Sequence, residues 1–86
     1  MPRTAAKVFG ALMKPLLNMV GPRVKKVRQK QGLTQPELAA RCVRLGWEVS
    51  DSIVSRIECQ SRTVADFELL CLAKALRVSP NHLWPS

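Results

Sequence analysis

The sequence is short of aromatic and acidic residues. Its 86 residues include two Phe, two Trp and no Tyr, and six acidic residues stand against fourteen basic ones. The core must therefore be built from Leu, Val, Ile and Ala, a composition that suits packed helices. A chain this small buries only about 60% of the surface that its unfolded form exposes, so self-association would help to stabilise it.

A long hydrophobic run is also absent. The six-residue run "VFGALM" at 8–13 ends at Lys14-Pro15, which makes it too short to cross a membrane. No A-x-A cleavage pattern follows it, so we do not expect a secretory signal. Apolar residues near helical spacing continue to Met19. We therefore interpret 1–20 as an N-terminal extension, either a frayed tail or an amphipathic segment that could bind a protein partner.

The residues that metal sites and catalysis require are scarce. Cys42, Cys59 and Cys71 are odd in number, and with the single His82 their spacing matches neither a zinc site nor a disulfide framework. We found no paired carboxylates and no glycine-rich phosphate loop. The sequence therefore predicts a protein that is not an enzyme, holds no metal or cofactor, and keeps its thiols reduced in the cytoplasm, with Cys42 packed and the other two partly exposed.

The basic residues are unevenly distributed. The net charge is +8, and residues 1–44 carry ten basic side chains against Glu37 alone. A basic half favours a polyanionic partner, with nucleic acid first and an anionic membrane surface second. A merely solubilising basic surface is the alternative to both.

From Gly21-Pro22 onward the pattern is helical throughout. Pro22 suits a first helical turn, and Gly32 a helix end. "TQPE" then reads as a capping box, in which Thr34 and Glu37 satisfy each other's backbone N–H groups. This second helix should end at Gly46, beyond which Trp47 could fold back as a hydrophobic cover.

Three further cap signals divide the rest of the chain. Ser50 is a good N-cap for a third helix, and Thr63 with Asp66 resembles a cap pair for a fourth. "SPNHLW" predicts a short fifth helix with Ser79 as its cap and Pro80 at its first position. Residues 21–86 are thus predicted to form one all-α domain of five short helices.

Three fragments in this order resemble the Xre/Cro-like helix-turn-helix family of phage and bacterial transcriptional repressors. They are "GLTQPELA", "VSDSIVSRIE" and "LAKALRVSPNHLW", and the resemblance covers about residues 21–84. It implies a compact five-helix lambda-repressor-like DNA-binding domain. Within it, Gln35–Leu45 would be the positioning helix and Asp51–Cys59 the recognition helix, which enters the major groove.

The resemblance also implies roles for individual residues. The base-reading candidates lie on the recognition helix and are Asp51, Ser52, Ser55 and Arg56. The phosphate-contacting candidates are Gln35, Arg62, Arg23 and Lys25. Asp51 could equally serve only to stabilise the positive end of the helix dipole. Arg28 and Glu58 match a structural ion pair of the family.

The connection between the two central helices, "RCVRLGWE", is longer than is common in the family. It leaves the mutual angle of these helices open, and we expect its Trp47 to pack on the core rather than to make a functional contact.

The function we expect is sequence-specific binding of double-stranded DNA by a transcriptional regulator, of the repressor type, associated with the nucleoid. One recognition helix offers few base contacts, so a homodimer on a palindromic operator is expected. Leu83 and Trp84 are candidates for the dimer contact or, equally, for plugs of the core. The alternative function is an antitoxin or protein-interaction adaptor built on the same fold.

Overall fold

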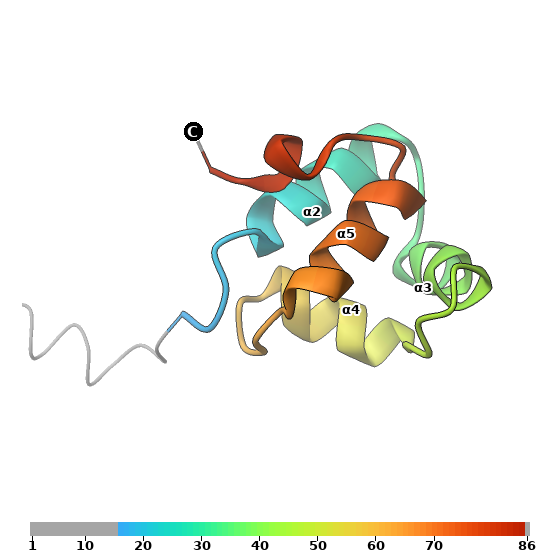
Figure 1. Cartoon of the computed structure of the whole chain (residues 1–86), viewed down its shortest axis with the longest axis horizontal. Helices are drawn as coiled ribbons and strands as arrows, with labels where there is room; N and C mark the ends of the chain where they lie inside the picture. The colour runs from blue at the N-terminus through green and yellow to red at the C-terminus, as the bar shows by residue number, and fades with distance from the viewer. Residues whose placement is uncertain (1–15, 86) are drawn as a thin grey trace, which may run out of the picture.

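The computed structural model describes residues 16–85, and within these residues the chain is helical with no β-strand (Figure 1). Its elements are α2 (Gly21–Lys30), α3 (Gln35–Arg44), α4 (Asp51–Glu58), α5 (Asp66–Ala75) and the 3₁₀ helix η1 (Pro80–Leu83). The predicted all-α class is confirmed for this part of the chain. The fifth predicted helix is a single 3₁₀ turn, and most of the predicted extension lies outside the described residues.

The predicted caps of α3 and α4 are confirmed. Thr34 Oγ1 accepts a hydrogen bond from the N–H of Glu37 at 3.2 Å, and Glu37 Oε1 accepts one from the N–H of Thr34 at 2.8 Å. Ser50 Oγ accepts the N–H of Ile53 at 3.3 Å. The two central helices therefore begin where the sequence predicts, and each ends one residue earlier.

The start of α5 differs from the prediction. Its N-cap is Ala65, which has no polar side chain, and the expected pair of Thr63 and Asp66 does not form the cap. Glu68 supplies half of a capping box instead, because its Oε1 accepts the N–H of Ala65 at 3.0 Å. Ser79, the predicted cap of the last helix, makes no side-chain cap hydrogen bond.

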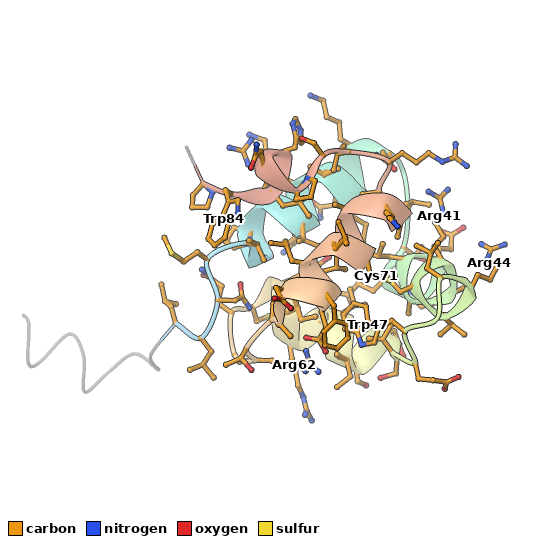
Figure 2. All side chains as sticks on the ribbon, viewed as in Figure 1. Arg41, Arg44, Trp47, Arg62, Cys71 and Trp84 are labelled. Atoms are coloured by element: carbon orange, nitrogen blue, oxygen red, sulfur yellow. The ribbon has the colours of Figure 1, made fainter. Side chains whose placement is uncertain are left out.

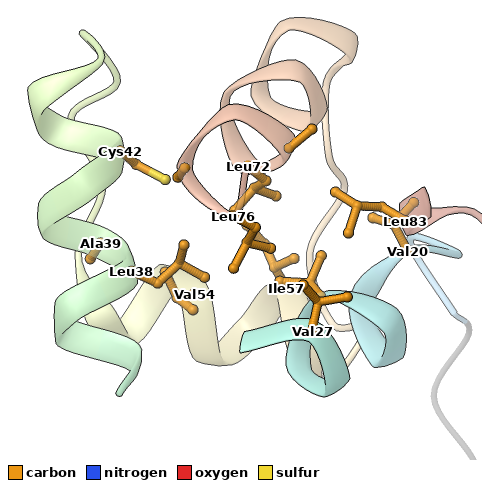
Figure 3. Close-up of a cluster of buried hydrophobic side chains, with 13 residues drawn as sticks. Val20, Val27, Leu38, Ala39, Cys42, Val54, Ile57, Leu72, Leu76 and Leu83 are labelled. Atoms are coloured by element: carbon orange, nitrogen blue, oxygen red, sulfur yellow. The ribbon is translucent and has the colours of Figure 1, made fainter. Parts of the chain in front are cut away.

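The core lies where α5 crosses the other helices, and it is almost entirely aliphatic (Figure 3). Its largest fully buried side chains are Leu38, Ile57, Leu72, Leu76, Leu83, Val24, Val54 and Cys42. Of the two roles considered for Leu83, the structure supports the core plug, since Leu83 is completely buried. Trp84 remains 47% exposed.

The long connection between α3 and α4 folds back onto the core. Gly46 adopts φ +100°, a conformation that favours glycine, and the N–H of Trp47 then donates to the carbonyl of Cys42 at 3.0 Å. Trp47 is partly buried against the core. The prediction that Trp47 folds back as a hydrophobic cover is thus confirmed. Helix α4 lies along one edge of the molecule (Figure 1).

Candidate nucleic-acid interface

Helix α4 presents a polar face to solvent. Asp51, Ser52 and Arg56 are exposed and Ser55 is half-buried, whereas Val54 and Ile57 are fully buried. Positions 51 and 55 lie in one row along the helix, and positions 52 and 56 lie in the row beside it. Helical periodicity therefore brings the four polar residues to one side. All four predicted base-reading residues are thereby brought together on the free side of the helix.

A buried hydrogen-bond network fixes the other end of α4. Glu58 is 6% exposed and accepts Arg28 Nε at 2.6 Å and Arg28 Nη2 at 3.0 Å. Gln35 Nε2 donates to the same carboxylate at 2.9 Å, and Arg28 Nη1 donates to the carbonyl of Leu33 at 2.7 Å. The hydrogen bond from Arg28 to Glu58 raises the pKa of the guanidinium. The predicted pair therefore lies at the junction of α2, α3 and α4.

Gln35, predicted as a phosphate contact, is part of this junction. The α3 N-terminus offers few further donors, because Pro36 has no N–H and the N–H of Glu37 is held by Thr34. The Glu37 carboxylate also lies there, and hydrogen bonds from Thr34 lower its pKa. A phosphate contact at this end of α3 remains a prediction, and the phosphate would lie beside the negative charge of Glu37.

Arg62, the second predicted phosphate contact, is tied to α5 (Figure 2). Its Nη1 and Nη2 donate to the two carboxylate oxygens of Glu68 at 3.0 and 3.2 Å, and Nη1 also donates to the carbonyl of Thr63 at 3.0 Å. The bond from Arg62 is the main cause of the lowered pKa of Glu68. The Arg62 side chain keeps 30% of its surface exposed, so it remains accessible at the edge of the loop that follows α4.

The two cations predicted on α2 are accessible as well. Arg23 is half-buried and lines a shallow surface hollow with Lys26 and Gln60, which lies just after α4. Lys25 is exposed on the same helix. Arg23 thus lies near the end of α4, and its contact with a phosphate stays a prediction.

Asn18 is a positioning residue that the sequence did not reveal. Its Nδ2 donates to the carbonyls of Ile57 at 3.0 Å and Arg62 at 2.8 Å, while its Oδ1 accepts the N–H of Gly21 at 2.7 Å. Gln60 Nε2 in turn donates to the Asn18 carbonyl at 3.0 Å. Asn18 stands among residues interpreted as an extension, where no cap pattern or periodicity marks it.

Gly21 permits this close contact between α2 and α4. A Cβ atom at this position would lie 2.1 Å from the carbonyl oxygen of Ile57, far inside contact distance. From the sequence, Gly21 is recognisable only as the residue before a helix-starting proline. The structure shows that the close approach of the Ile57 backbone is what requires a glycine at this position.

The thiols behave as predicted. Cys42 is buried, Cys71 is half-buried and Cys59 is exposed just after α4. Burial is the largest cause that raises the pKa of Cys42 to about 12, and the adjacent Cys71 adds to it. Within residues 16–85 no three Cys, His, Asp or Glu side chains gather as a metal site would need. None of the helices described is long and apolar enough to cross a membrane.

One solved structure gives a clear comparison. The chain superposes on the restriction-modification controller protein C.AhdI from Aeromonas hydrophila with a TM-score of 0.68 and 31% sequence identity. The match covers 76% of this chain and 87% of the other. No protein-family model and no curated protein matches the sequence.

Proposed function

Because the chain belongs to the family of the controller protein C.AhdI, we propose that it is a sequence-specific, double-stranded-DNA-binding transcriptional regulator of the cytoplasm and nucleoid. The observation that carries this proposal is the state of α4. Its polar face is free while its far end is fixed by the buried Glu58 network. A helix held in this way can present side chains to base edges without first losing conformational freedom.

In the proposed complex α4 enters the major groove with its N-terminus first. Arg56 has the fork of donors that pairs with O6 and N7 of guanine, and Asp51 can accept from N4 of cytosine. Ser52 and Ser55 are short enough to let the helix approach closely. This side of the helix supplies the sequence preference.

The phosphates would be contacted by the surrounding polar groups, which are Arg23, Lys25, Arg62 and Gln35. These contacts set the register of the protein on the duplex. A homodimer on a palindromic operator would place two α4 helices about one turn of DNA apart, roughly 34 Å. Occupation of the major groove excludes other proteins from the same site, so we propose repression as the direct effect.

The test combines operator selection with one substitution. Oligonucleotides selected from a random pool should converge on a palindrome, and Arg56→Ala should then weaken operator binding by about 1–3 kcal/mol and relax preference at one base pair per half-site. Lys30→Ala, which removes a cation from the last turn of α2, is the matched control and should leave the base preference unchanged. Equal weakening on all sequences would make Arg56 a phosphate contact instead.

Cys59 offers a second, native probe. Its thiol is exposed directly after the polar face of α4, so bound operator DNA should slow its alkylation while leaving the alkylation of unfolded protein unchanged. Alkylation at the same rate with saturating DNA would show that the duplex does not reach the C-terminal end of α4.

A protein-interaction adaptor is the second candidate function, and the exposed apolar side chains of α5 favour it. The two functions differ in salt dependence. A DNA binder that neutralises Z phosphates should show a log–log slope near −0.9Z, whereas apolar docking changes little with salt. Absence of duplex binding at low salt would reject the regulator and leave the adaptor.

A further inference from the structure

A shallow hollow between the C-terminal ends of α3 and α5 is lined mainly by basic side chains. Its volume is about 240 Å³, and the residues that line it are Arg41, Arg44, Leu45, Lys74, Ala75 and Arg77. Arg41 and Arg44 come from the last turn of α3, and Lys74 comes from the last turn of α5. We call this site, with its four cations, the basic hollow.

The cations of the basic hollow form no salt bridge within the part of the chain that the structure describes. The arginines paired there are Arg28 and Arg62, and both lie elsewhere. Glu37 lies one turn before Arg41 on α3, but its carboxylate accepts the N–H of Thr34. A concave surface lined by charges of one sign concentrates the potential of that sign, so the basic hollow attracts an anion.

The helix ends account for only part of this gathering of cations. A cation in the last turn is stabilised by the negative end of the helix dipole, and Arg41 Nη1 donates to the carbonyl of Ala75 at 3.0 Å. This contact fixes the Arg41 guanidinium between the two helices. Arg44, Lys74 and Arg77 are exposed, and their side chains make no hydrogen bond within residues 16–85. Their donors are therefore available to a partner.

Arg77 has a backbone conformation that is unfavourable for an arginine. Its φ is +58°, in the left-handed region, at the second residue after the end of α5. The same position after α2 and α3 is a glycine, Gly32 and Gly46, as this conformation favours. Gln60 holds the position after α4, and its side chain is used within the chain, because it donates to the Asn18 carbonyl. The Arg77 side chain has no such use, which points to a contact outside the chain.

We propose that the basic hollow binds an acidic segment of a protein partner. The carboxylates of this segment contact Arg41, Arg44 and Arg77, because the planar fork of a guanidinium matches the two oxygens of a carboxylate. Leu45 lines the same hollow and is 50% exposed, so it offers an apolar contact between the cations. A segment that carries aliphatic residues among its acidic ones fits both parts. The inference goes beyond the proposed function, since it assigns the chain a second binding surface.

Position and chemistry favour a peptide over a further contact with duplex DNA. Gln35 begins α3 and Arg62 precedes α5, so these proposed phosphate contacts lie at the N-terminal ends of the two helices. The basic hollow lies at their C-terminal ends, and Figure 2 shows Arg41 and Arg44 well apart from Arg62. A nucleic-acid backbone also has no aliphatic group to cover Leu45. Duplex DNA is therefore the alternative occupant that the experiment must reject.

Fluorescence anisotropy with the full chain tests the proposal. The probe is a short fluorescent peptide of aspartate and glutamate with leucines at its centre. Arg44→Gln should weaken peptide binding about tenfold, as expected for the loss of one charge-assisted contact. Arg56→Gln removes the same charge from α4, so it is the matched control and should bind the peptide as wild type does. Serines in place of the peptide's leucines should also weaken binding, because the contact with Leu45 is lost.

Arg77→Gly separates peptide binding from folding. Glycine adopts the left-handed conformation without strain, so the Tm of this variant should not fall below that of wild type. Peptide binding should nevertheless weaken about tenfold, because one guanidinium is lost. A loss of this kind cannot come from an unfolded chain. Wild-type peptide affinity in Arg77→Gly would remove Arg77 from the site and overturn the proposal.

Binding to the selected operator supplies the remaining outcomes. Arg44→Gln and Arg77→Gly should keep close to wild-type affinity for the operator, whereas Arg56→Gln should lose affinity. If the first two variants weaken operator binding as much as peptide binding, the basic hollow belongs to the DNA surface and the proposal is overturned. A peptide that fails to bind at low salt would also overturn it and leave the regulator intact. A chain that binds the peptide but no duplex would retain this inference and lose the regulator.

Discussion

The Glu58 carboxylate is the polar group on which the geometry of the three central helices most depends. It accepts two hydrogen bonds from Arg28 and one from Gln35, and the side chains of Arg28 and Glu58 are only 9% and 2% exposed. Glu58→Gln keeps the shape of the side chain but removes its charge. It also turns an amide NH₂ group toward donors, leaving the buried guanidinium without its counter-ion.

The expected loss is large. Breaking a buried pair by neutralising one partner costs about 3–5 kcal/mol, because the remaining charge is uncompensated. Small domains are stable by only about 5–15 kcal/mol in total, so the variant should be near its folding limit. Since 1 kcal/mol shifts the Tm of a domain of this size by about 4–8 °C, the Tm should fall by at least about 12 °C.

Urea unfolding followed by Trp fluorescence and circular dichroism measures this loss. Two comparisons sharpen it. Arg28→Met combined with Glu58→Met should recover much of the loss, because an apolar pair leaves no buried charge. Arg62→Ala, which breaks the pair whose arginine side chain is 30% exposed, should cost less than Glu58→Gln. A Glu58→Gln loss as small as that of Arg62→Ala would refute the central role given to the buried network.

Three further predictions follow from named contacts. Gly21→Ala should lower the free energy of unfolding by about 1–3 kcal/mol in urea titrations, because the added Cβ would meet the Ile57 carbonyl. Gly32→Ala is the control for backbone strain alone, since Gly32 has φ +71° and open space around it. The free energy of unfolding should fall as the pH drops below the ordinary carboxyl pKa of 4.5, because the pKa of Glu68 is lowered in the folded state and the unfolded chain takes up the proton first. In Glu68→Gln the free energy of unfolding should fall less steeply over the same pH range. Mass spectrometry of maleimide labelling at neutral pH should find Cys59 modified first and Cys42 only on unfolding, since burial raises the pKa of Cys42 to about 12; early labelling of Cys42 would contradict its packing.

The parts of the fold that follow local rules were predictable from the sequence. The hydroxyl oxygens of Thr34 and Ser50 have no better local donors than the first-turn N–H groups, so the starts of α3 and α4 could be placed to the residue. The start of α5 could not, because Glu68 is drawn to Arg62 and to the N–H of Ala65 together. A cap that depends on a tertiary ion pair leaves no local pattern.

The candidate site was predictable in its exposed half only. Helical periodicity is enough to gather Asp51, Ser52, Ser55 and Arg56 on one side of α4. The contacts of Asn18 with Ile57 and Arg62 span about forty residues of sequence, and no periodicity encodes such a pairing. The family resemblance supplied the Arg28–Glu58 pair but not the third member, Gln35.

The polar contacts of α4 are unequal at its two ends, and this inequality bears on how it can act. At the C-terminal end, Glu58 and the carbonyl of Ile57 are held by side chains from α2, from α3 and from the segment before α2. At the N-terminal end, Ser50 caps the helix locally while Asp51 and Ser52 face solvent. A helix fixed at one end and free at the other can enter a groove only with its free end. In the proposed complex, the direction of α4 therefore follows from where its hydrogen bonds lie.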